Sequence, residues 1–126
     1  MHSKKRFWLR LMIGVGLASA AFILGYFVGI PAYGAWQARC DISNGQARYL
    51  LHGELAPHEE EVASLIQQRY GVRLDRVAYC IVTDSLVRRC DAYNRRVNTH
   101  FGFTSGRDMF GSTLDELMTN EQKSRQ

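Results

Sequence analysis

Hydrophobic and polar positions divide the chain into two unlike parts. Residues 11–30 form an apolar run of 20 residues without a charged side chain, whereas residues 37–119 alternate short apolar stripes with polar positions. A helix of this length rises about 30 Å, the hydrocarbon thickness of a bilayer. We therefore expect a transmembrane helix at residues 11–30, an interfacial linker at 31–36, a small domain at 37–119 and a polar tail at 120–126.

A cleaved export signal is the alternative interpretation of this run. Signal peptides have apolar segments of about 7 to 15 residues and end at a small-x-small triplet. Ala32-Tyr33-Gly34 offers such a triplet, so cleavage after Gly34 would release the domain. The greater length of residues 11–30 favours an uncleaved anchor.

The flanking charges predict how the anchor is oriented. Residues 1–10 carry four basic side chains, whereas Arg39 and Arg48 are the only basic residues among the twenty that follow the run. The positive-inside rule then keeps the N-terminus in the cytoplasm. We expect a single-pass protein of a bacterial inner membrane with a periplasmic C-terminal domain, in direct contact with the lipid bilayer.

Small residues recur along one side of the expected span. Gly14, Ala18, Ala21, Gly25 and Gly29 fall within a narrow arc at the α-helical rotation of about 100° per residue. Small side chains allow two helix backbones to approach closely in lipid. This face is a candidate helix–helix contact, either with a second copy of the chain or with another membrane protein.

The domain pattern predicts mainly helix with one or two strands. Apolar spacing favours a short helix at 41–52, a helix after Pro57 that ends at Gly71, and a longer helix at 85–101 capped by Thr83 or Asp84. Residues 72–82 are rich in β-branched and aromatic side chains and favour a strand. A final helix is expected around 113–118. The predicted fold is one transmembrane helix followed by a small, mainly α-helical α+β domain outside the cytoplasm.

Three cysteines follow the expected span, in a compartment where disulfides persist. Cys80 falls in the expected strand, and Cys90 lies on the apolar stripe of the helix that should pack against it. We expect a Cys80–Cys90 disulfide, with Cys40 left over. The alternative is that both residues are small buried apolar side chains.

The net charge of +4 comes entirely from the N-terminus. Without residues 1–10, the chain has 12 basic and 12 acidic side chains and is formally neutral. A nucleic-acid-binding domain would carry a basic excess of its own, so nucleic acid is not an expected partner. Basic residues nevertheless gather on the helix at 85–101, where Arg88, Arg89, Arg95 and Arg96 lie beside or opposite its apolar stripe. They are candidates for docking an acidic protein surface or anionic lipid headgroups.

No motif specifies a reaction, a metal or a cofactor. His58-Glu59-Glu60-Glu61-Val62 begins like a zinc-protease helix but has Val62 where the second histidine is required. We expect no cofactor. The sequence favours a binding protein over an enzyme, namely an accessory, regulatory or inhibitory partner of another envelope or membrane protein. The alternative is a small envelope enzyme, such as a glycan hydrolase, that uses paired carboxylates.

Overall fold

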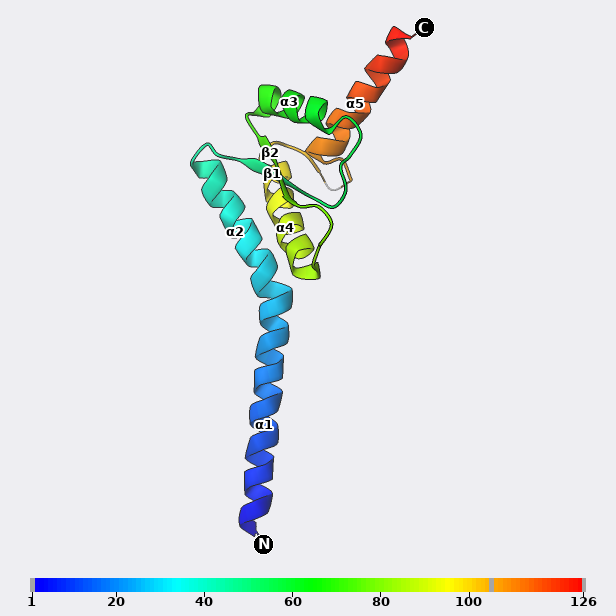
Figure 1. Cartoon of the computed structure of the whole chain (residues 1–126). Helices are drawn as coiled ribbons and strands as arrows, with labels where there is room; N and C mark the ends of the chain where they lie inside the picture. The colour runs from blue at the N-terminus through cyan, green and yellow to red at the C-terminus, as the bar shows by residue number, and fades with distance from the viewer. Residues whose placement is uncertain (1, 105, 126) are drawn as a thin grey trace.

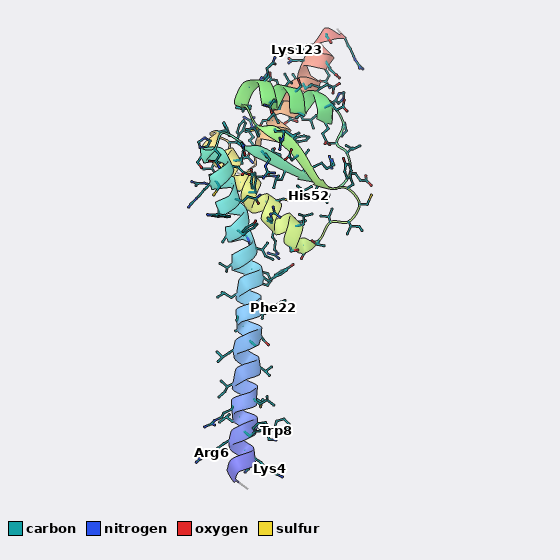
Figure 2. The ribbon with its side chains drawn as sticks, turned by 60° about the vertical axis from the view of Figure 1, so that its left-hand side comes forward. Lys4, Arg6, Trp8, Phe22, His52 and Lys123 are labelled. Atoms are coloured by element: carbon teal, nitrogen blue, oxygen red, sulfur yellow. The ribbon has the colours of Figure 1, made fainter. Side chains whose placement is uncertain are left out.

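One uninterrupted helix forms the N-terminal third of the computed structural model, which describes residues 2–104 and 106–125 (Figure 1). It comprises α1 (His2–Leu24), a π-helical segment η1 (Gly25–Gly29) and α2 (Ile30–Ser43). From Lys4 onward, the side chains of α1 project into open space on all sides, as Figure 2 shows around Trp8 and Phe22. This helix is long and apolar enough to span a membrane. Residues 31–36, expected as a linker, are helical.

The helix continues through Pro31 because its backbone widens there. A proline ring inside an α-helix clashes with the carbonyl four residues earlier and removes one hydrogen bond. In η1 the backbone N–H of Ile30 instead donates to the carbonyl of Gly25, five residues earlier. The wider turn accommodates Pro31 without breaking the helix, so the domain stays connected to α1 by continuous helix.

The domain begins with a β–α–β unit. Strand β1 (Arg48–His52) leads to α3 (Glu59–Tyr70) and then to β2 (Arg73–Ala78), which pairs parallel to β1 with Arg48 opposite Arg73. The expected strand at 72–82 is therefore shorter than its apolar pattern. Gly71 takes a left-handed φ of 67° and ends α3, as the sequence predicts.

The prediction of a helix at 41–52 is wrong. Helix α2 ends at Ser43, and Gly45 with a φ of 68° turns the chain into β1. The N–H of Gln46 closes this turn by donating to the carbonyl of Asp41 at 2.8 Å. The apolar spacing of Ala47, Leu50 and Leu51 resembles that of a helix. The backbone of this segment nevertheless forms its hydrogen bonds with β2, as a strand.

Helix α4 (Asp84–His100) forms the centre of the domain. The Thr83 hydroxyl caps it by accepting from the N–H of Leu86, and Cys90, Tyr93 and Val97 on its expected apolar stripe are buried. Helix α5 (Met109–Ser124) starts earlier than expected because the Asp108 carboxylate caps its first turn, and it also ends later than expected. Around α4 the buried core gathers side chains from α2, β1, α3 and α5.

Helices α2 and α4 pack side by side at close range (Figure 1). Gly34 and Ala38, one turn apart on α2, are both buried. A Cβ atom on Gly34 would lie only 2.4 Å from the backbone oxygen of Arg89. Cleavage after Gly34 would cut α2 within this contact.

The expected Cys80–Cys90 disulfide is absent, since all three cysteines are free thiols. Strand β2 ends at Ala78, so Cys80 lies beyond it and is exposed, whereas Cys90 is 1% exposed in the core. Burial raises the pKa of the Cys90 thiol and favours its protonated form. Cys90 serves as a small apolar core residue.

Candidate functional site

The four arginines of α4 separate into two groups. Arg88 and Arg89 are half-buried and turn toward the N-terminal helix, whereas Arg95 and Arg96 are exposed nearer the C-terminal end of α4. The sequence pattern predicts one docking face made of all four arginines. In the structure, only Arg95 and Arg96 are open to a partner that approaches the far end of the domain.

Aromatic rings hold the two half-buried arginines. The Arg88 guanidinium lies 4.7 Å from the ring centre of Phe27 and 5.4 Å from that of Tyr26. Arg89 lies 5.3 Å from the Tyr33 ring centre, and its Nη2 donates to Oε1 of Gln37 at 2.8 Å. These contacts attach the start of α4 to the last turns of the expected span and to α2.

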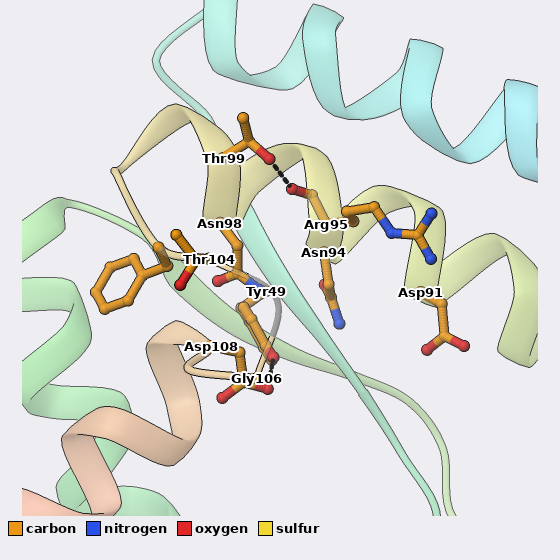
Figure 3. Close-up of a pocket in the computed structure, with 10 residues that line it drawn as sticks. Tyr49, Asp91, Asn94, Arg95, Asn98, Thr99, Thr104, Gly106 and Asp108 are labelled. Carbon is orange, nitrogen blue, oxygen red and sulfur yellow. Dashed lines mark hydrogen bonds between the residues drawn. The ribbon is translucent and has the colours of Figure 1, made fainter.

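A polar cleft of about 520 Å³ opens along α4 (Figure 3). It lies where α4, β1 and the segment leading into α5 meet. The lining residues that the structure describes are Tyr49, Asp91, Asn94, Arg95, Asn98, Thr99, Phe103, Thr104, Gly106 and Asp108.

Three of these side chains hold the walls of the cleft together. Asn94 accepts from the N–H of Leu50 through Oδ1 and donates to its carbonyl through Nδ2, so it pairs with the free edge of β1. Asn98 accepts from the N–H of Met109 at 3.0 Å. Asp108 accepts the Tyr49 hydroxyl at 2.9 Å and caps α5. These amides and this carboxylate are positioning groups of the cleft.

Asp91 and Arg95 leave their charged ends available. One helical turn separates them on α4, and neither side chain forms a hydrogen bond or ion pair with the described residues. Across the cleft, burial and the Asp108 carboxylate raise the pKa of Tyr49, which favours the protonated hydroxyl that donates to Asp108. The cleft therefore presents one free anion and one free cation beside a fixed polar wall.

An ionic network links α2, β1, β2 and α4. Asp41 of α2 accepts from Arg48 Nη2 and from the Tyr93 hydroxyl, both at 2.7 Å, and Arg48 also reaches Asp75 at 3.3 Å. Burial raises the pKa of Asp41, but the hydrogen bonds from Tyr93 and Arg48 outweigh this effect and lower it. Burial, together with the hydrogen bond to Asp41, raises the pKa of Tyr93 to about 12.

The small-residue face of the expected span differs in its surroundings from one end to the other. A Cβ atom on Gly14, Gly25 or Gly29 would meet nothing within 4 Å among the described residues. The five-position alignment assumes a regular α-helix, whereas residues Gly25–Gly29 form the π-helical segment η1. Gly25 and Gly29, unlike Gly14, both border a groove shared with the domain.

The expected site residues are thus only partly brought together, and the cleft itself lies outside the sequence prediction. Among the carboxylates of the domain, Glu59 is in an ion pair with Arg76, whereas Asp91 shares the cleft with Asp108. The aspartate before Met109 could have been recognised as a helix cap. The meeting of Tyr49, Asn94 and Asp108 has no local signal, because 59 residues separate Tyr49 from Asp108.

Comparison with known proteins gives no relative: no family model, curated protein or solved structure matches this chain.

Proposed function

We propose that this protein is a single-pass membrane-anchored binding module. Its domain would act as an accessory, regulatory or inhibitory partner of another membrane or envelope protein, with the N-terminus in the cytoplasm and the domain outside it. The observation that carries the proposal is the continuous helix from α1 through α2, which packs tightly on α4. Such a connection gives the cleft of α4 a fixed direction relative to the anchor.

The chemistry of the cleft supports a polar protein partner. Asp91 and Arg95 offer charges of opposite sign, and Arg96 adds a further exposed cation on the same helix. An acidic side chain of a partner can bind the planar guanidinium of Arg95 through two hydrogen bonds. Complementary charges of this kind select partners and guide encounter more than they add raw affinity.

Site-specific photocrosslinking in intact cells tests the proposal. A photoreactive residue at Thr99, in the cleft, should give a discrete crosslinked species that Arg95→Glu abolishes. The same residue at Gln68, exposed on α3, is the control and should give none. Equal crosslinking from both positions, or a Thr99 product that Arg95→Glu leaves unchanged, would contradict the cleft as the binding surface.

Orientation is tested with reporters fused to the C-terminus. A periplasmic reporter should be active and a cytoplasmic one silent, because the basic flank precedes the span. Activity of the cytoplasmic reporter alone would refute the orientation.

One observation favours an enzyme as the second candidate. Asp91 and Asp108 line the same cleft, as hydrolysis by paired carboxylates requires. Purified protein should then release soluble fragments from cell-wall glycan, and Asp91→Asn should lose that activity while Asp115→Asn, exposed on α5, retains it. Glycan left intact by the wild-type protein would remove this candidate.

A further inference from the structure

A second groove joins the N-terminal helix to the domain at the level where the expected span ends. It has a volume of about 610 Å³. Gly25, Gly29 and Ile30 form one wall, and Ile81, Leu86 and Arg89 are among the residues of the other. At 1.5 Å per residue, the first wall belongs to the last 8 Å or so of the apolar run.

An apolar segment of the domain lies beside this groove. We call it the apolar tip, and it consists of Val77, Tyr79, Ile81 and Val82 at the end of β2 and in the connection to α4. Their exposed fractions are 42%, 60%, 83% and 36%. Large apolar side chains that cluster on a surface usually mark an interface. Here Figure 1 shows that the connection descends to the end of the domain nearest α1.

Positive charge lies next to these apolar surfaces. Arg88 and Arg89 form no ion pair within the described residues, and the Nε atom of each is buried without a hydrogen-bond partner there. A buried donor without an acceptor is unfavourable. The other N–H groups of these guanidiniums are suitable donors to a phosphate oxygen, because guanidinium groups bind phosphate with directed, charge-assisted hydrogen bonds.

We propose that this groove binds an anionic phospholipid of the membrane that holds the anchor, with an acyl chain against Gly25, Gly29 and Ile81 and the phosphate at Arg89, which lines the groove next to Arg88 on α4. The inference rests on the proposed membrane anchoring. A lipid is the occupant because one wall of the groove is itself part of the apolar run, so lipid chains adjoin it once the run is inserted. The apolar tip rests in the interfacial layer beside this lipid and fixes the tilt of the domain.

Native mass spectrometry of the full-length protein in detergent tests the inference, with phosphatidylglycerol or phosphatidylcholine added at equal concentration. The wild-type protein should retain phosphatidylglycerol about tenfold more strongly, which corresponds to about 1.4 kcal/mol. Arg89→Gln should remove this preference. Ile81→Asp should reduce retention of both lipids, and because Ile81 is 83% exposed, this change spares the core.

Arg107→Gln is the charge-matched control, since Arg107 is exposed ahead of α5 and does not line the groove. It removes the same charge and should leave the lipid preference unchanged. Equal retention of both lipids by the wild-type protein would overturn the inference, as would an equal loss in Arg107→Gln and Arg89→Gln.

Carbonate extraction of cell membranes separates this inference from the proposed function. Protein that stays in the membrane but shows no lipid preference contradicts the groove alone. Protein that carbonate releases contradicts the anchor itself.

Discussion

Gly34→Ala should destabilise the domain, although alanine is the better helix former. An ideal Cβ at this position lies 2.4 Å from the carbonyl oxygen of Arg89 and 3.2 Å from its carbonyl carbon. Carbon–oxygen contacts of this kind normally begin near 3.3 Å, so α2 and α4 would have to separate by about 1 Å. Both obstacles are backbone atoms of a helix, which cannot move aside as the end of a flexible side chain can.

The size of the effect follows from two opposing contributions. Overpacking a close contact costs about 1–3 kcal/mol, and the upper end applies because backbone is displaced. Replacing glycine by alanine inside a helix returns about 1 kcal/mol. The expected net loss is on the order of 2 kcal/mol, or roughly 10 °C in Tm for a domain of about 90 residues.

Thermal unfolding of the full-length protein in detergent, followed by circular dichroism, measures this loss. Gly16→Ala is the control, because a Cβ atom at Gly16 meets nothing within 4 Å and should leave the domain transition unchanged. A Gly34→Ala protein as stable as the wild type would refute the close packing of α2 on α4.

Three further predictions concern acid, thiols and the anchor. Hydrogen bonds lower the pKa of Asp41 in the folded state. The stability that this carboxylate contributes is therefore present above its ordinary pKa of 3.8 and is lost as the pH falls below that value. Unfolding measured over an acid titration should show this loss in the wild type and a weaker loss in Asp41→Asn. Because the thiols are free, the midpoints of urea unfolding with and without reductant should agree, whereas a midpoint that drops on reduction would show a disulfide. Cys80→Ser should change the free energy of unfolding by less than about 0.5 kcal/mol, and Cys90→Ser should lower it by about 1–3 kcal/mol. If the small-residue face of α1 binds another helix, Gly14→Ile should abolish association in a membrane two-hybrid assay and Ala20→Ile should not; equal association in both would leave α1 as a passive anchor.

Local signals in the sequence located much of the domain. Glycine after an apolar stripe ends α3 at Gly71, and a hydroxyl before a stripe starts α4 at Thr83. These features work because a helix cap depends on residues within one turn of it. Strand β1 was missed for the opposite reason: five residues become a strand by pairing with β2 across α3, a partner that no neighbouring residue specifies.

The candidate site was less accessible to sequence reasoning. Periodicity placed the arginines of α4 outside its apolar stripe, but it could not tell which of them a second helix would cover. Packing of α2 on α4 directs Arg88 and Arg89 to the N-terminal helix and leaves Arg95 in the cleft. The small residues show the same difference between pattern and packing. The close contact between α2 and α4 involves Gly34 and Ala38, which lie outside the expected span.

Patterns in the sequence suffice to identify the apolar run, its basic flank, the caps at Thr83 and Gly71 and the apolar stripe of α4, because each depends on residues within a few turns of one another. The folded structure was needed to establish that Pro31 lies inside a continuous helix, that residues 48–52 form β1 and that Cys90 packs in the core. It also decided that Tyr49, Asp91 and Asp108 share a cleft. Contacts between distant segments are fixed by how well their surfaces fit and by the backbone groups they satisfy, and a linear pattern records only one side of each contact.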